Sequence, residues 1–219
     1  MRVIAIDGPA GAGKSTVARA CAEALGLEVL NTGAMYRAVT YAVISAGADT
    51  SDPNACTSAA SSAKIELSDR VILDGVDISQ EIRGALVTSE VSTVSAHPGV
   101  REVLVEKQRL WASQHGGAVV EGRDIGTVVF PDALVKVFLT ASDEERARRR
   151  VIDEQSAGRE AKFAEVEADL ARRDATDSGR SISPLVAAED ALILDSTTMA
   201  IDEVVETIVR EFLEREVLQ

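Results

Sequence analysis

The sequence has few aromatic residues, few cysteines and no long hydrophobic run. Aromatic residues make up 3% of the 219 residues, and the two cysteines, Cys21 and Cys56, form neither a disulfide-rich pattern nor a zinc-ligand spacing. No run of about 18 apolar residues is present that would predict a membrane-spanning helix. We therefore expect neither a disulfide scaffold, nor a structural zinc domain, nor an integral membrane protein.

Positive charge is also scarce. Lysine and arginine number 23 against 36 aspartate and glutamate residues, which gives a formal net charge of −13. Because binding to nucleic acid or to an anionic membrane depends on a basic surface, we expect neither partner; a small charged ligand in a local basic pocket stays compatible with this balance. The first residues show no basic leader and no cleavage site, which together with the few cysteines predicts a cytoplasmic protein.

Aliphatic residues are abundant, and hydrophobic residues make up 46% of the chain. Short apolar runs predict five strands, at 3–6, 28–30, 118–120, 135–139 and 191–194. Apolar residues at helical spacing predict helices at 14–25, 34–45, 99–114, from about Ser142, and at about 199–217. Since neighbouring parallel strands need crossover connections, this alternation predicts an α/β protein with a doubly wound, parallel, five-stranded sheet.

The stretch 63–82 breaks the alternation. Its apolar and polar residues alternate, with turn signals at Ser68-Asp69 and Asp74-Gly75, which predicts short antiparallel strands. We interpret it as an insertion (about 61–85) into a single domain, residues 1–219, whose core comprises about 1–60, 86–150 and 163–219. The segment at about 151–162 is predicted to form a lid, with Gly158 as a hinge.

A glycine-rich loop follows the first predicted strand. The residues from Gly8 to Ser15 fit GxxxxGK[ST] between a buried strand and a helix, as this motif requires. Its backbone N–H groups converge on phosphate oxygens, Lys14 reaches the β- and γ-phosphates, and the Ser15 hydroxyl ligates Mg²⁺. The loop predicts a nucleoside triphosphate site formed by Gly8, Pro9, Ala10, Gly11, Ala12, Gly13, Lys14, Ser15 and Thr16.

Arginines are concentrated after residue 145. Eight lie within the 35 residues that end at Arg180: Arg146, Arg148, Arg149, Arg150, Arg159, Arg172, Arg173 and Arg180. Surface ion pairs along a helix explain part of this, because acidic residues stand four positions before Arg148, Arg149 and Arg173. The remainder predicts a guanidinium clamp around several phosphates, since arginine forms forked bonds to phosphate.

No general base is evident. The two histidines, His97 and His115, lie at predicted helix ends and belong to no HxD-type catalytic loop. An alcohol acceptor would need such a base, whereas the oxygen of a phosphate acceptor is already ionised at neutral pH. The pattern therefore favours phosphorylation of a monophosphate.

Several segments together resemble one family over nearly the whole chain. They are IDGPAGAGKS at 6–15, NTGAMYR at 31–37, residues 91–101, GRDIGTVVFP at 122–131 and RDATDSGR at 173–180 with Pro184-Leu185; residues 194–197 are similar too. On these segments the chain resembles the bacterial cytidylate kinases, a family of P-loop nucleoside monophosphate kinases. The resemblance implies a monomer that transfers the γ-phosphoryl group of ATP to CMP or dCMP and requires Mg²⁺, with the insertion binding the nucleoside monophosphate.

The resemblance also implies roles for single residues. Arg146 and Arg149 would join the loop residues in binding ATP. The residues implied for CMP are Thr32, Tyr36, Arg37, Ser92, Arg101, Arg123, Asp124, Arg173, Asp177 and Arg180. The residues implied for catalysis are Lys14, Arg123, Arg149, Arg150 and Arg180.

The chemistry of cytosine independently favours Asp124 as a base-recognising residue. Cytosine presents an exocyclic amino donor that a carboxylate accepts, whereas uracil presents an oxygen that it would repel. Other interpretations stay open: Asp124 as a helix cap or a partner of Arg123, Arg37 and Arg101 on a solvated helix face, and Tyr36 as a packing residue.

Two other functions also stay open. Another P-loop kinase, acting on UMP, AMP or shikimate, would share the loop, and a non-catalytic regulator would bind ATP only to switch conformation. The clustered arginines favour an enzyme, because a regulator needs no second polyanion pocket. The sequence departs from its relatives at Glu121, where aspartate is common, and at Thr32, where some carry serine; no role is predicted for Glu121.

Overall fold

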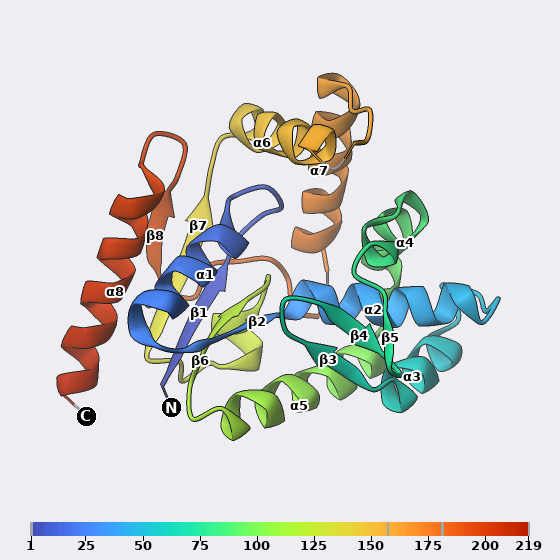
Figure 1. The fold of residues 1–219 in the computed structure, drawn as a ribbon, viewed down its shortest axis with the longest axis horizontal. Coiled ribbons are helices and arrows are strands. Elements are labelled where there is room, and N and C mark those ends of the chain that lie inside the picture. The colour runs from blue at the N-terminus through green and yellow to red at the C-terminus, as the bar shows by residue number, and fades with distance from the viewer. Residues whose placement is uncertain (1, 157, 181, 219) are drawn as a thin grey trace. The chain divides into compact units, whose positions relative to one another are not determined.

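The computed structural model describes residues 2–156, 158–180 and 182–218 (Figure 1). The chain divides into two compact units. One comprises Met1–Val29 and His115–Gln219 and is called the P-loop unit here. The other, Leu30–Gln114, is called the helical unit. The predicted division into core, insertion and lid stays a prediction.

A parallel five-stranded sheet forms the centre of the P-loop unit, as predicted. Its strands are β1 (Val3–Asp7), β2 (Glu28–Asn31), β6 (Ala118–Glu121), β7 (Val135–Thr140) and β8 (Leu192–Asp195), in the order β2-β6-β1-β7-β8. Every residue of β1 is buried, because β1 pairs with β6 on one side and β7 on the other. The sheet order places the loop after β1 at the middle of the sheet, where β1 and β6 end together.

Four helices accompany this sheet: α1 (Lys14–Leu25), α6 (Asp143–Ser156), α7 (Phe163–Ser178) and α8 (Ile201–Val217). Helices α1 and α8 lie side by side against the sheet (Figure 1), and Val17, Cys21, Ile208 and Phe212 belong to their common apolar core. Helices α6 and α7 pack on each other. Helix α7 was not predicted, because seven of its 16 residues are charged and only Leu170 and Asp177 are buried.

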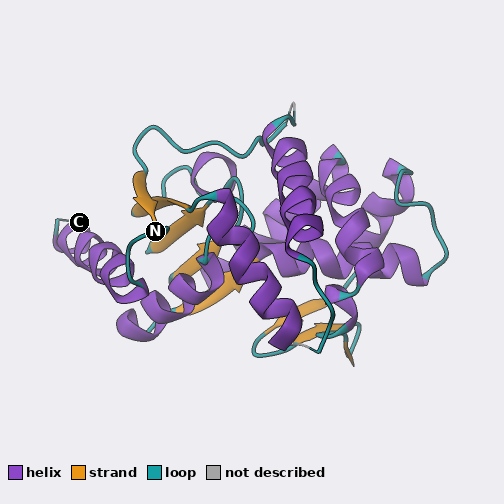
Figure 2. Ribbon diagram, turned by 90° about the horizontal axis from the view of Figure 1, so that it is seen from above, coloured by secondary structure: helices purple, strands orange, loops and turns teal. Residues whose placement is uncertain are grey.

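The helical unit contains the elements α2 (Thr32–Ser45), α3 (Pro53–Ser62), α4 (Ala85–Ala96), α5 (Pro98–Gln114), the 3-10 turn η1 (Glu81–Arg83) and three short strands. The strands β3 (Ile65–Leu67), β4 (Val71–Leu73) and β5 (Val76–Asp77) form the predicted antiparallel sheet (orange in Figure 2). Its apolar side packs against α2 through Ala38, Leu73 and Ile78.

Helices α3 and α4 were missed in the sequence. The start of α3 carries an ordinary signal, since Asp52 caps it and Pro53 opens it, but its serine and alanine residues resemble a loop edge. Helix α4 contains five valine and threonine residues, which lower helix propensity. In the part of the chain that the structure describes, no helix is long and apolar enough to cross a membrane.

Candidate nucleotide site

The glycine-rich loop connects β1 to α1 and requires glycine where it leaves the sheet. Gly8 has φ +146°, and a Cβ atom added there would lie 1.9 Å from the carbonyl oxygen of Leu139 in β7. No side chain fits at that distance, so the loop starts in close contact with the neighbouring strand. The predicted strand–loop–helix arrangement of the motif is therefore present.

Lys14, the first residue of α1, is almost completely buried. Its Nζ donates a hydrogen bond of 2.7 Å to the carbonyl oxygen of Pro9. Burial, with the nearby guanidinium of Arg123, lowers the pKa of Lys14 well below its ordinary value, and Glu121 opposes this shift. An anion bound beside Lys14 would favour its charged form, so the site is suited to a phosphate.

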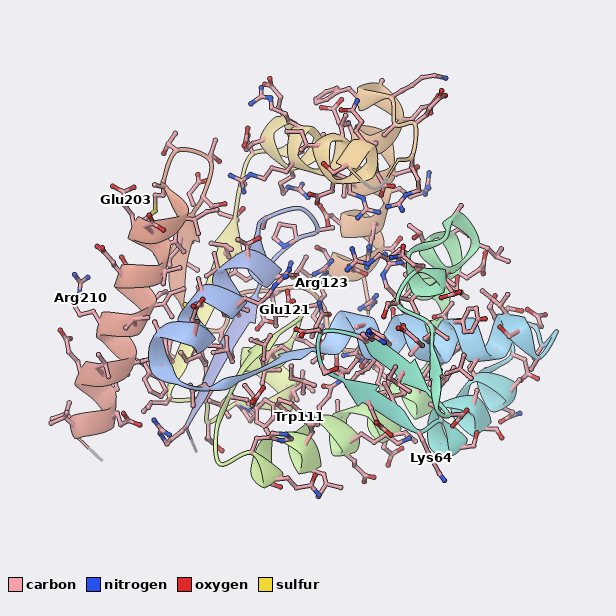
Figure 3. All side chains as sticks on the ribbon, viewed as in Figure 1. Lys64, Trp111, Glu121, Arg123, Glu203 and Arg210 are labelled. Atoms are coloured by element: carbon pink, nitrogen blue, oxygen red, sulfur yellow. The ribbon has the colours of Figure 1, made fainter. Side chains whose placement is uncertain are left out.

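Ser15 and Glu121 bring two oxygen ligands together. The Ser15 hydroxyl donates to Glu121 Oε2 at 2.9 Å, and Glu121 is the buried last residue of β6 (labelled in Figure 3). Mg²⁺ prefers such hard oxygen donors and is commonly held by one or two protein groups plus phosphates of the substrate. The pair fits this ion, and among the described residues no group of three acidic, histidine or cysteine side chains offers another metal site.

The segment that follows β6 is fixed to the end of β1 by Asp7. The two carboxylate oxygens of Asp7 accept hydrogen bonds from the backbone N–H groups of Ile125 (2.7 Å) and Gly126 (2.8 Å). These belong to a π-helical turn, η2 (Ile125–Val129), where a loop was predicted. Burial raises the pKa of Asp7 to about 6 although both hydrogen bonds oppose this shift. Asp7 thereby positions the neighbouring Arg123 and Asp124.

Three arginines converge on Asp177 in α7. Arg123 Nε donates to Asp177 Oδ2 at 2.9 Å and Arg180 Nη2 to Oδ1 at 2.5 Å, while Arg173 Nε lies 4.0 Å from Oδ2. Burial, followed by repulsion from Arg123, lowers the pKa of Arg173 to about 10. A cluster with three guanidinium groups and one carboxylate has excess positive charge, which suits a phosphate-bearing ligand.

Asp124 is buried and its side chain does not cap η2, so the cap interpretation is wrong. Arg123 forms its ion pair with Asp177, and its Nη1 donates to the carbonyl oxygen of Gly8 at 3.0 Å. The interpretation of Asp124 as the partner of Arg123 is therefore not supported. Both residues follow β6, and Figure 3 shows Arg123 beside Glu121 at this end of the strand.

The arginines of α6 differ in what they contact. Arg149 Nη2 donates to the carbonyl oxygen of Ser196 at 2.6 Å and its Nε to Glu145 at 3.0 Å. Its Nη1 lies 3.4 Å from the carbonyl oxygen of Ala12, so this residue contacts the glycine-rich loop. Arg150 pairs with Glu154 on its own helix. Arg148 is 56% exposed and pairs with Glu144 and Glu145, as surface pairing predicts.

Arg146 and Arg172 complete this comparison. The guanidinium of Arg146 is buried and bound by Asp143, Asp174 and the carbonyl oxygen of Ala10. Arg172 is 72% exposed and pairs with Asp169 at 2.8 Å. The predicted pairing of Asp169 with Arg173 is wrong, because Arg173 turns toward Asp177 instead. Arg159 also pairs with Glu154.

The remaining residues implied for CMP belong to the helical unit. Arg101 is only 4% exposed, its Nη1 donates to the carbonyl oxygen of Ser95 at 3.2 Å, and its guanidinium lies over the ring of Tyr36, 5.4 Å from the centroid. Arg37 is half-buried and donates to the carbonyl oxygen of Ile82 and to Thr88 Oγ1. The interpretation that Arg37 and Arg101 lie on a solvated helix face is therefore wrong.

Thr32 is the buried first residue of α2, and Ser92 is half-buried in α4. The residues implied for CMP are thus divided between the two units. Arg123, Asp124, Arg173, Asp177 and Arg180 belong to the P-loop unit; Thr32, Tyr36, Arg37, Ser92 and Arg101 belong to the helical unit.

Four residues of the site were missed in the sequence. They are Asp7, Glu121, Asp174 and Ser196. Asp7, Asp174 and Ser196 all lie inside segments on which the family resemblance rests, so the motif boundaries could have indicated them. Their partners, however, lie more than 20 residues away in the chain, and the sequence alone does not pair them.

Comparison with known proteins gives one consistent result. A family model for cytidylate kinase matches residues 4–214. The chain is 48% identical over 213 residues to a cytidylate kinase of Desulfitobacterium hafniense, covering 95% of this chain and 91% of that protein. It is 51% identical over 209 residues to a cytidylate kinase of Mycolicibacterium paratuberculosis, covering 93% and 92%.

Solved structures agree in fold. A gluconokinase from Sinorhizobium meliloti 1021 aligns with a TM-score of 0.51 at 16% identity, covering 99% of this chain and 94% of that chain, which shows a shared fold and no more. The residues matched by the family model include every segment of the site described above, and both relatives cover more than nine-tenths of this chain. This chain belongs to the cytidylate kinase family.

Proposed function

We propose that this protein transfers the γ-phosphoryl group of ATP to CMP or dCMP, producing ADP and CDP or dCDP. The observation that carries the proposal is the convergence of Arg123, Arg173 and Arg180 on one carboxylate in the unit that also holds the buried Lys14. A site with one lysine and several guanidinium groups suits two phosphate-bearing ligands and exceeds what ATP binding alone requires.

The glycine-rich loop would hold the phosphates of ATP. In this assignment residues 8–16 supply backbone N–H groups, and Lys14 neutralises charge on the transferring group. Ser15 and Glu121 would hold Mg²⁺ together with phosphate oxygens of the nucleotide, which is supported by their 2.9 Å hydrogen bond. When bound, Mg²⁺ supplies neutralisation of phosphate charge.

The acceptor would be recognised by the residues divided between the two units. We assign cytosine recognition to Ser92, Arg101 and Asp124, and binding of phosphate and ribose to Thr32, Tyr36, Arg37, Arg123, Arg173, Asp177 and Arg180. Burial supports the assignment for Arg101 and Asp124, because a buried polar group left without its hydrogen bond by the wrong base penalises that base.

The reaction needs little covalent chemistry from the protein. An oxygen of the acceptor phosphate forms a bond to the γ-phosphorus, the bond from that phosphorus to the β,γ-bridging oxygen breaks, and ADP leaves with the electron pair. Because the attacking oxygen is already ionised, no base is required. Lys14, Arg123, Arg149, Arg150 and Arg180 would stabilise the charge that spreads over the transferring group.

The predicted lid keeps its place in this proposal. Helix α6 extends to Ser156, so the first part of the segment 151–162 is helical. Gly158 has φ +73°, a conformation that favours glycine, and it remains the proposed hinge. Movement of this segment toward bound ATP would exclude water. A monomeric state and a cytoplasmic location stay predictions.

An ADP-release assay with CMP, dCMP, UMP, AMP and shikimate as acceptors tests the function. We expect turnover with CMP and dCMP, much less with UMP and AMP, and slow ATP hydrolysis without an acceptor. Turnover only with another acceptor would assign a different P-loop kinase activity. ATP binding without turnover on any acceptor, together with no binding of labelled CMP, would favour a regulator.

A further inference from the structure

Arg146 lies at the glycine-rich loop but is already bound on several sides. Its Nη1 donates to the carbonyl oxygen of Ala10 at 2.9 Å and to Asp174 Oδ2 at 2.5 Å, and its Nη2 donates to Asp143 Oδ1 at 2.7 Å. The side chain of Arg146 is 6% exposed. A guanidinium with two carboxylate partners is already neutralised, so it offers little net charge to a phosphate.

Asp174 completes the contact from helix α7. Its Oδ1 accepts a hydrogen bond of 3.4 Å from the backbone N–H of Ala10, while its Oδ2 binds Arg146. Both polar backbone groups of Ala10 are therefore bound by one ion pair: the N–H by Asp174 and the carbonyl by Arg146. This arrangement fixes the orientation of Ala10 between two helices that lie far away in the sequence.

The packing around this ion pair is close. A Cβ atom added to Gly11 would lie 3.0 Å from both the Cβ and the carbonyl oxygen of Arg146. Ala10 itself belongs to a small apolar cluster with Ala147 of α6 and Leu170 of α7. The first turn of the glycine-rich loop thus rests directly on α6 and α7, and the loop cannot move without disturbing this contact.

We infer that Arg146 and Asp174 are a positioning pair: they hold Ala10 and Gly11 so that the loop presents its backbone to the nucleotide, and Arg146 does not itself bind a phosphate. This role differs from the one that the family resemblance implies for Arg146. Burial alone would lower the pKa of Arg146, but Asp143 and Asp174 outweigh it and raise the pKa, so the pair stays ionised. The inference rests on the proposed function in one respect, namely that the loop binds ATP.

The affinities of ATP and ADP distinguish positioning from direct contact. A residue that binds the γ-phosphate affects ATP far more than ADP, whereas a residue that shapes the loop affects both equally. We therefore expect Arg146→Gln and Asp174→Asn each to weaken both nucleotides by about tenfold in calorimetric titration. The two residues act through one contact. The double variant should therefore bind ATP and ADP with about the same affinity as whichever single variant binds them less tightly.

The two helices supply matched controls. Arg148→Gln on α6 and Asp169→Asn on α7 remove the same charges from exposed ion pairs and should leave both affinities unchanged within about twofold. Arg146→Lys adds a second measurement, because lysine keeps a phosphate-binding charge but lacks the fork that binds three partners. It should weaken ATP and ADP as much as Arg146→Gln does.

Two results would overturn the inference. One is a loss of ATP affinity in Arg146→Gln at least tenfold larger than the loss of ADP affinity, with Arg146→Lys restoring it. The other is a loss of nucleotide affinity in the double variant equal to the product of the losses in the two single variants. Urea denaturation must show that each of these variants is folded. Failure of the wild-type protein to bind ATP or to phosphorylate CMP would instead refute the proposed function, so the two failures are distinguishable.

Discussion

The two units of this chain differ in how much charge they bury. Seven charged side chains are buried among the described residues of the P-loop unit: Asp7, Lys14, Glu121, Asp124, Lys136, Arg146 and Asp177. In the helical unit, among the residues that the structure describes, only Arg101 is both charged and buried. Burying an ion is unfavourable unless it is paired, so a fold retains such groups mainly where function requires them.

Each unit holds its buried guanidinium groups through several contacts. In the P-loop unit carboxylates hold guanidinium groups, as Asp177 holds Arg123 and Arg180. In the helical unit Arg101 donates to the backbone carbonyl of Ser95, and its guanidinium lies over the ring of Tyr36. The chain has a net charge of −13 and nevertheless contains a basic site. The positions of the buried charged residues locate this site, whereas the overall composition does not. Removing one buried charge should strongly lower turnover or stability in the P-loop unit, and should chiefly weaken CMP binding in the helical unit.

The largest effect is expected at Lys14. Lys14→Met should lower kcat about 10⁴-fold, the size typical for loss of a charge that stabilises a transferring phosphoryl group. Stability should not fall, because burial already lowers the pKa of Lys14 and the charged form is unfavourable without a ligand. An ADP-release assay and urea denaturation measure the two properties. A loss of stability above about 2 kcal/mol would show that Lys14 is chiefly structural.

Asp177→Asn should be the most destabilising change. It leaves three arginines without their shared carboxylate, and breaking such a buried pair costs about 3–5 kcal/mol. The free energy of unfolding from urea denaturation measures this, with Asp169→Asn on the same helix as an exposed control. Equal stability of the two variants would contradict the contrast between the units.

The raised pKa of Asp7 predicts how the stability of the protein depends on pH. The pKa of Asp7 is about 6 in the folded protein against an ordinary value of 3.8, so the folded state binds this proton more tightly than the unfolded chain. Its contribution to stability is therefore complete below pH 4 and is lost as pH rises through about 6, by about 3 kcal/mol in total.

Urea denaturation of Asp7→Asn at pH 4.5 and pH 7 tests this contribution. The fall in the free energy of unfolding over that interval should be smaller in the variant than in the wild type by about 2 kcal/mol. The amide loses one of the two acceptors for Ile125 and Gly126, so the variant should also be less stable at the lower pH. The exposed Asp195 has a pKa that Thr197 lowers, so Asp195→Asn should not reproduce the effect.

The smallest of these effects is expected at Arg101. Arg101→Met should raise the KM for CMP by about 30-fold and change the KM for ATP little, because one hydrogen-bonded charge typically contributes about 2 kcal/mol. Stability should change by less than for Asp177→Asn. Steady-state kinetics with both substrates measure the split. Equal changes in both KM values would mean that the helical unit does not act locally.

The P-loop and the strands of the sheet could be predicted from the sequence because each depends on a contiguous stretch of residues. The motif from Gly8 to Ser15 and the apolar runs of the strands need no partner to be recognised. Helices α3, α4 and α7 were missed because serine, valine and charged residues weaken the helical pattern, and packing overrides propensity there.

The site could be predicted as a set of residues but not as a set of partners. The arginine concentration was visible, yet which arginines turn inward was not: Arg146 and Arg148 are two positions apart and differ in burial. Arg146 is buried because it binds Ala10 in the loop and Asp174 in α7, and both partners are distant from it in the sequence. Glu121 gained a role only from its distance to Ser15.

The contact between Gly8 and Leu139 has a consequence for variation at the loop. In a saturation library screened for kinase activity, position 8 should accept glycine alone, because every other amino acid would push β1 and β7 apart. Gly26, where an added Cβ meets no atom within 4 Å, should accept asparagine, which tolerates its left-handed backbone. Active variants would thus distinguish a glycine required by close contact with the sheet, such as Gly8, from a glycine that only ends a helix, such as Gly26.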